Sequence, residues 1–250
     1  MDVRVTPPAD WIDVPLTNVL TLAATAVAHT RYPWLGFRDP LAEAVWLELG
    51  ACEGELEDRA LRAALGRTLQ LDDFARAWTH ETPRGRVVEV GAGLSTRHAR
   101  LTGLASPILS VDEAPLAEIR RAVFPTHHTF TQVTAPLEQR SWMRRAAAPR
   151  EALFVVVEDA FLDLDTGDVL TTLASLAAEL PPGSRLAVSH GPRARFAVAN
   201  PGARRATLEV HAEHESGERQ VARFPRFTWV TPPSTGEDEP GPEVALLEAA

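Results

Sequence analysis

The stretch that decides the fold reads Val87-Val88-Glu89-Val90-Gly91-Ala92-Gly93-Leu94-Ser95-Thr96-Arg97. An apolar strand leads directly into a Gly-x-Gly turn and then into a helix. Glycine permits positive φ and lets a ligand approach the backbone, because no Cβ intervenes. Asp112 ends the next predicted strand about 20 residues further on, where its carboxylate can accept hydrogen bonds from a ribose. The stretch therefore predicts a site for a nucleoside-containing ligand.

Strands and helices alternate around this stretch. The predicted strands span residues 86–90, 107–112, 129–133, 152–157, 185–189, 207–213 and 226–230. The predicted helices span residues 17–31 with Thr17 as cap, 40–49 with Asp39 as cap, 56–78, 95–103, 114–123, 137–147 and 169–180. This alternation predicts a doubly wound α/β fold, with a mostly parallel sheet covered on both faces. The last two strands are expected to form an antiparallel edge.

The chain divides into three predicted parts. Residues 1–80 are read as an N-terminal helical cap, and residues 81–232 as a cofactor-binding α/β core that forms one compact domain with the cap. Residues 233–250 are predicted to form an acidic tail, and we expect the proline- and glycine-rich stretch over residues 232–242 to be loose.

Composition limits the partners. The net charge of −9 argues against a nucleic-acid or anionic-membrane surface. The longest apolar stretch, residues 19–28, is too short to span a bilayer, and no cationic-then-apolar signal segment opens the chain. We therefore expect a cytoplasmic protein with a small-molecule substrate; the sequence does not predict its oligomeric state.

Missing residue types exclude several chemistries. All 25 basic residues are arginine, so neither a Schiff-base lysine nor the lysine of a phosphate-binding Walker loop is available. Cys52 is the only cysteine, which excludes an intramolecular disulfide and a cysteine metal cluster. No Gly-x-Ser-x-Gly motif of a serine hydrolase occurs, and the histidine spacing predicts no catalytic metal.

Two cofactors suit a Gly-x-Gly turn followed by an acidic residue. Thr96 stands where a dinucleotide site has its third glycine, and the bulky Arg97 follows it. S-adenosylmethionine carries no phosphate and has less need of a bare helix N-terminus, so these residues favour it over NAD. A nicotinamide oxidoreductase is further disfavoured because Tyr32 is the only tyrosine and no Tyr-x-x-x-Lys pair exists.

A family resemblance points the same way. It is carried by residues 88–97 with Arg100-Leu101, by residues 17–43 ending Arg38-Asp39-Pro40-Leu41-Ala42, by Val111-Asp112 with Arg120-Arg121, and by Glu158-Asp159-Ala160-Phe161-Leu162. Over roughly residues 15–190, the chain resembles the leucine carboxyl methyltransferase family. That family includes bacterial O-methyltransferases of polyketide and other natural-product pathways. The resemblance implies the class I, Rossmann-like methyltransferase fold and S-adenosylmethionine as cofactor.

The resemblance also implies roles for matched residues. Gly91 and Gly93 would face the methionine moiety and Asp112 the ribose, Glu158 would lie beside the amino or sulfonium end, and Arg31 would pair with the carboxylate. The full set of expected cofactor residues is Arg31, Glu89, Gly91, Ala92, Gly93, Asp112, Glu113, Leu137 and Glu158.

The chain departs from the family at two places. Pro136 replaces the aspartate expected to read the adenine, which leaves Leu137 to pack on the ring, and the segment after Glu158 is altered. We predict an O-methyltransferase acting on a hydroxyl or carboxylate of a small molecule. A carboxylate needs no base, whereas His190, at the end of a predicted strand, is the candidate base for a hydroxyl. The alternative is a protein of this fold that has lost catalysis and serves as a binding or scaffolding partner.

Overall fold

The computed structural model describes residues 14–49, 56–101, 103–104, 108–124, 130–146, 151–190, 194–198, 207–213, 219–231 and 243–249. The described helices are α1 (Leu16–Arg31), η2 (Pro33–Leu35), α2 (Pro40–Glu48), α3 (Asp58–Glu81), α4 (Arg97–Arg100), α5 (Ala114–Val123), α6 (Arg140–Ala146), α7 (Ala160–Asp163) and α8 (Thr166–Glu179). The described strands are β1 (Arg86–Val90), β2 (Ile108–Asp112), β3 (Phe130–Thr134), β4 (Leu153–Val157), β5 (Arg185–His190), β6 (Ala194–Val198), β7 (Thr207–Glu213), β8 (Arg219–Thr231) and β9 (Glu243–Ala249).

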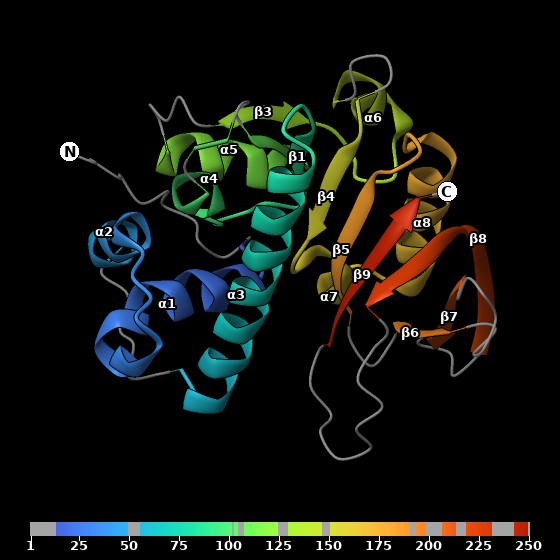
Figure 1. Cartoon of the computed structure of the whole chain (residues 1–250). Helices are drawn as coiled ribbons and strands as arrows, with labels where there is room; N and C mark the ends of the chain where they lie inside the picture. Colours follow the sequence, from blue (N-terminus) through green and yellow to red (C-terminus); the bar gives the residue numbers. More distant parts are fainter. Residues whose placement is uncertain are drawn as a thin grey trace.

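One mixed sheet of nine strands organises the described chain, in the order β3-β2-β1-β4-β5-β9-β8-β7-β6 (Figure 1). The first five strands in this order pair in parallel, as expected for a doubly wound fold. From β5 onward every pairing is antiparallel. The α/β prediction is confirmed, but the prediction of a mostly parallel sheet is wrong, because the antiparallel portion is as large as the parallel one.

The antiparallel half contains two strands that the sequence analysis missed. β9 lies inside the predicted acidic tail, where the sequence analysis expected no strand, and it pairs with β5 on one side and β8 on the other. Its apolar residues bury on both faces of the sheet, which outweighs the acidic composition around it. β6 adds the outermost strand. The predicted pairing of residues 207–213 with the following strand is confirmed, although β8 begins at Arg219.

Alternate residues of the strands point to opposite faces of the sheet, and different helices pack on each face. In β4, for example, Val155 and Val157 join the buried cluster that includes α6 and α8, whereas Phe154 and Val156 pack with Trp78 of α3. By the same alternation in β1, Glu89 points to the same face as its neighbour Val87, which packs against α3. A carboxylate in the middle of an apolar strand is thus directed at α3.

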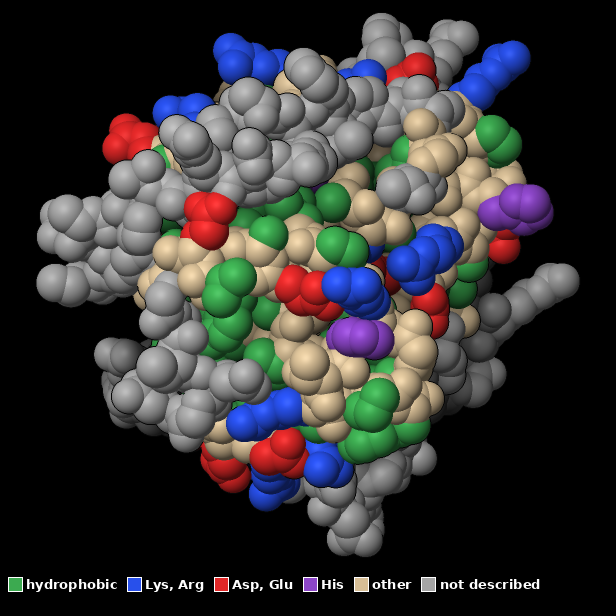
Figure 2. Space-filling view, turned by 90° about the vertical axis from the view of Figure 1, so that its left-hand side faces the viewer, with side chains coloured by type: hydrophobic (Ala, Val, Ile, Leu, Met, Phe, Trp, Pro, Cys, Tyr) green, Lys and Arg blue, Asp and Glu red, His purple; other side chains and the backbone are tan. Residues whose placement is uncertain are grey.

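The N-terminal helices pack on one another and on α5. Their shared core runs through Leu22, Val27, Val45 and Leu65 to Val123. Over the face that they present, basic and acidic side chains lie next to one another (Figure 2). No described helix combines the length and the apolarity needed to cross a bilayer.

Helix ends follow local chemistry. Asp39 caps α2 as predicted, since its side chain accepts a hydrogen bond from the Ala42 N–H at 3.0 Å. The predicted Thr17 cap is wrong, because α1 begins at Leu16 and Pro15 occupies the cap position. The predicted helix over residues 95–103 shrinks to the single turn of α4, which ends where Leu101 leaves the helical conformation at ψ 66°.

A testable prediction concerns the seat of α3 on the sheet. A Cβ at Gly85 would lie 2.1 Å from the ring of buried Trp78, whereas one at Gly66, on the exposed side of α3, would meet nothing within 4 Å. Gly85→Ala should therefore lower the free energy of unfolding by about 1–3 kcal/mol through overpacking. Gly66→Ala, the matched control, should raise it by roughly 0.5–1 kcal/mol because it removes a helix-interior glycine. Urea titration followed by circular dichroism measures both, and equal effects would contradict the packing described here.

Candidate functional site

Three predicted residues meet at one edge of the sheet. Gly91 follows β1, Asp112 ends β2 and Glu158 follows β4. The chain passes from β1 to β2 on one side, while β4 pairs with β1 on the other, so connections diverge in opposite directions from β1. Open α/β sheets bind their ligands at such a switch point, outside the carboxyl ends of the strands.

The glycine loop has the backbone that its sequence predicts. Gly91 and Gly93 adopt φ values of +64° and +47°, in the left-handed region. A Cβ at residue 91 would lie 2.5 Å from the Ala160 Cβ and 3.7 Å from Leu137. A Cβ at residue 93 would lie 1.5 Å from the Asn18 Oδ1. Both glycines are therefore also required by the chain's own packing.

Asp112 is fully buried beside this loop. Its Oδ1 accepts a hydrogen bond from the Gly93 N–H at 2.8 Å. Its Oδ2 is buried with no hydrogen-bond partner among the described residues. Burial raises the pKa of Asp112 to about 6, against the opposing effect of the Arg120 guanidinium and the loop N–H groups. One carboxylate oxygen is thus left to accept a hydrogen bond from a ligand.

Arg97 is the centre of the site's electrostatics. Its guanidinium is fully buried, with Nε 2.6 Å from Asp72 Oδ1 and Nη2 2.6 Å from Glu158 Oε2, and Nη1 donates to Glu89. Burial acts to lower the pKa of Arg97, but Glu158, Glu89 and Asp72 together raise it well above its ordinary value. The side chain therefore stays a cation and joins α3, β1 and β4.

Further polar contacts extend this cluster to α2. Arg100 Nε lies 2.7 Å from Asp72, and its Nη1 lies 2.8 Å from Asp39. Thr96 donates its hydroxyl to Asp39 at 2.6 Å, and Thr68 of α3 donates to Glu158. The α2 cap, α3 and the glycine loop are consequently tied together by one buried network.

The buried charges around the loop do not balance. The buried carboxylates are Asp39, Asp72, Glu89, Asp112, Glu158 and Asp159, and the buried guanidiniums are Arg67, Arg97, Arg100 and Arg120. Arg120 points its Nη1 at the carbonyl oxygens of Gly93 and Ser95, both at 2.8 Å. Within the described part of the chain, six buried acids thus face four buried cations. An interior with surplus negative charge favours a cationic ligand or a protonated acid.

Two predicted cofactor residues lie away from this group. Arg31 stands at the far end of α1, about 20 Å of helix rise from Asn18, with its Nη1 4.0 Å from Asp58. Glu113 is exposed at the N-cap of α5. By contrast, Ala92 and Leu137 are buried within the group, and Leu137 lies against Gly91.

The candidate base occupies a dry position. His190 ends β5, one strand beyond β4, and its ring stacks on Phe196 with centroids 4.7 Å apart. Burial, with Arg195 nearby, lowers the pKa of His190 to about 4. The imidazole is neutral at pH 7 but a weaker base than an ordinary histidine.

Cys52, the chain's one cysteine, lies outside the described residues. Among those described, no group of three His, Cys, Asp or Glu side chains is arranged to hold a metal ion.

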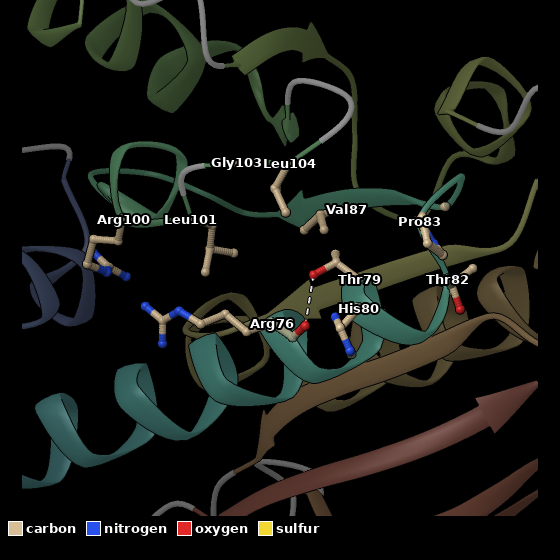
Figure 3. A pocket seen from close by; sticks show the side chains of 11 residues that line it. Arg76, Thr79, His80, Thr82, Pro83, Val87, Arg100, Leu101, Gly103 and Leu104 are labelled. Atoms are coloured by element: carbon tan, nitrogen blue, oxygen red, sulfur yellow. Dashed lines mark hydrogen bonds between the residues drawn. The ribbon is translucent and has the colours of Figure 1, made fainter.

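A cavity of about 470 Å³ lies at the other end of β1, between α3 and the turn after α4 (Figure 3). Arg76 and Arg100 line it at one end, and Thr82 and Pro83 at the other. The donors of Arg100 are already engaged by Asp72, Asp39 and Thr96. Its place in the buried network therefore accounts for the direction of this side chain.

Sequence reasoning missed most of the network. Asn18, Thr68 and Asp72 were read only as parts of helical periodicity. The available signal was a polar residue on an apolar helix stripe: Thr68 and Asp72 continue the buried face of Leu61, Ala64 and Leu65. Polar groups in such positions are buried with partners, so they mark a network.

Comparisons with known proteins add the following. No protein-family model and no curated protein sequence matches the chain. Its structure is similar to that of an S-adenosylmethionine-dependent methyltransferase from Clostridium acetobutylicum, at 8% identity and a TM-score of 0.48, covering 83% of this chain and 97% of that one. It is also similar to magnesium protoporphyrin IX methyltransferase from Synechocystis, solved with bound S-adenosylhomocysteine, at 13% identity and a TM-score of 0.47, covering 89% and 97%.

A third similar structure is the CcbJ methyltransferase from Streptomyces caelestis, at 13% identity and a TM-score of 0.44, covering 72% of this chain and 89% of that one. At identities and TM-scores this low, the likenesses bear on neither cofactor nor reaction. The leucine carboxyl methyltransferase resemblance stays a prediction.

The raised pKa of Asp112 gives a pH prediction. The pKa is about 6 in the folded chain against an ordinary value of 3.8. Stability contributed by the protonated acid is therefore full below pH 4 and lost as the pH rises through 6. Relative to Asp112→Asn, the wild type should lose about 3 kcal/mol of unfolding free energy between pH 4 and pH 7. Denaturant titrations at both pH values measure this difference, and a pH-independent difference would contradict it.

A second prediction tests the network. Arg97→Met should lower the free energy of unfolding by about 3–5 kcal/mol, because it leaves three buried carboxylates without their shared cation. Arg144→Met is the matched control: Arg144 is exposed and lies 3.6 Å from the half-buried Glu179, and the loss of this pair should change little. Similar denaturation midpoints for the two variants would show that the buried cluster does not hold the fold.

Proposed function

We propose that this chain binds S-adenosylmethionine at the switch point and transfers its methyl group to a small molecule. The observation that carries the proposal is the surplus of buried carboxylates around a Gly-x-Gly loop. S-adenosylmethionine brings a sulfonium and an ammonium against one carboxylate, so it reduces that surplus. The pyrophosphate of NAD would add negative charge to a region that already holds too much.

The donor set fits this cofactor. Asp112 Oδ2 is a buried acceptor without a partner among the described residues, which suits a ribose hydroxyl. Glu89 Oε2 is a second such acceptor. The backbone of Gly91, Ala92 and Gly93 would lie along the methionine portion, with Glu158 near its cationic end. The room over Gly93 is taken by Asn18, so the fit requires that side chain to leave.

The protein's part in the reaction is mostly placement. When bound, S-adenosylmethionine supplies a methyl group on an already activated sulfonium, so proximity and alignment are what remains to be provided. The low pKa of His190 makes this imidazole a poor base for a phenol or alcohol. A carboxylate acceptor is ionised at neutral pH and needs none. We therefore favour O-methylation of a carboxylic acid, with a natural-product acid as the substrate class that the family resemblance suggests.

One observation favours the alternative of a non-catalytic binding protein. Ala160 lies over Gly91 and Asn18 over Gly93, so the chain's own side chains occupy the space above both glycines. A scaffold that no longer binds cofactor would have the same closed loop. Ligand binding separates the two proposals.

Calorimetry with S-adenosylmethionine, S-adenosylhomocysteine and NAD is the first measurement. We expect both sulfur ligands to bind and NAD not to. Asp112→Asn should weaken binding by roughly tenfold or more, because the amide still accepts from Gly93 N–H but replaces Oδ2 by a donor. Glu118→Gln, on the exposed side of α5, is the matched control and should leave binding unchanged.

Absence of binding at millimolar concentration would exclude the enzyme and leave the scaffold. Given binding, incubation with methyl-labelled S-adenosylmethionine and separate panels of small carboxylic acids, phenols and amines identifies the acceptor. Label transfer to phenols or amines alone would contradict the carboxylate preference.

A further inference from the structure

The first turns of α1 present a buried polar edge to the switch point. Asn18 and Thr21 lie one turn apart on this helix, and both side chains are buried. Thr21 donates its hydroxyl to Asp159, after β4, at 2.7 Å. Asn18 reaches the loop after β1. The helix therefore contacts both sides of the crevice with side chains that can exchange hydrogen bonds.

Asn18 fills the space that makes the loop suitable for a ligand. Its Oδ1 lies 1.5 Å from where a Cβ of residue 93 would stand, so it occupies the hollow left by the glycine. The same oxygen accepts from the Leu94 N–H, at 3.4 Å. That bond is long, and long hydrogen bonds are weak, so an acceptor on a ligand can replace it at small cost.

Resting on the proposed function, we infer that Asn18 is a built-in competitor of the cofactor. In the ligand-free chain, the Asn18 side chain fills the space beside Gly93. It lowers the affinity for the cofactor because it has to move out before the cofactor can bind. A loop lined with buried backbone N–H groups needs an acceptor in the absence of ligand, and the Asn18 amide oxygen provides one without adding charge to an already negative site.

The test compares S-adenosylhomocysteine affinity of the wild type, Asn18→Ala and Thr25→Ala by calorimetry. Thr25 is buried on the same helix, and among the described residues its hydroxyl bonds to the α1 carbonyl groups of Thr21 and Leu22 alone, so it controls for loosening of α1. We expect Asn18→Ala to bind roughly twofold to fivefold more tightly, as fits the displacement of one long hydrogen bond, and Thr25→Ala to bind like the wild type. Equal or weaker binding by Asn18→Ala would overturn the competitor role, while wild-type binding would keep the proposed function. No binding by any variant would overturn both.

A ligand-independent cycle guards against misfolding of the variant. Gly93→Ala is made in the wild type and in the Asn18→Ala background, and both losses of stability are measured by urea titration. Strain from the positive φ is common to both backgrounds and cancels in the comparison. A smaller loss in the Asn18→Ala background supports the seating of Asn18 in the hollow. Equal losses overturn it.

Discussion

The buried guanidinium of Arg97 is the interaction on which the rest of the site depends. It pairs with one carboxylate from α3, one from β1, the next element along the chain, and one from the residue that follows β4. Desolvating such a group is expensive, and its pairings roughly offset that cost, so the apolar core remains the main source of stability. The ion cluster fixes the alignment of α3 on the sheet, because Asp72 of α3 can pair with Arg97 in only one register. The placement of the helices over the glycine loop follows from that register.

The same constraint explains why the site is both polar and closed. Through Arg100 and Asp39 the network reaches the cap of α2, and α1 packs on α2 and α3. Asn18 and Thr21 are thereby held over the loops that follow β1 and β4. Because the ion network places α1 over the site, this helix has to bury the polar side chains of Asn18 and Thr21. The hydrogen-bond partners of these side chains are a backbone N–H and a carboxylate beside the glycine loop, where a ligand would bind. Cover and binding surface therefore have one physical origin.

The sequence predicts the features that depend on neighbouring residues and misses those that depend on contacts between distant parts of the chain. Strand alternation and the Gly-x-Gly turn are local, so β1 to β5 and the positions of Gly91, Gly93 and Asp112 could be predicted. β9 was missed because its composition resembles a tail, and only its pairing between β5 and β8 buries it. Asp72 was missed for a related reason, since a lone acid on a helix is ordinarily solvated. Asp72 is buried because it pairs with Arg97, which lies 25 positions away, and no local sequence pattern links the two residues.

Charge links the ligand to the protonation of the site. Asp112 titrates near pH 6 because it is buried and because Glu89 adds negative charge nearby, despite the opposing Arg120 and loop N–H groups. A cationic ligand that also donates to Oδ2 stabilises the ionised form and expels the proton. Below pH 6, ligand binding is therefore coupled to the deprotonation of Asp112. Above pH 6 Asp112 is already ionised, so binding no longer depends on its protonation. Burying the Asp112 Oδ2 without a hydrogen-bond partner among the described residues costs free energy in the ligand-free chain. A ligand that donates to this oxygen recovers that free energy, and the recovered free energy adds to the ligand's affinity.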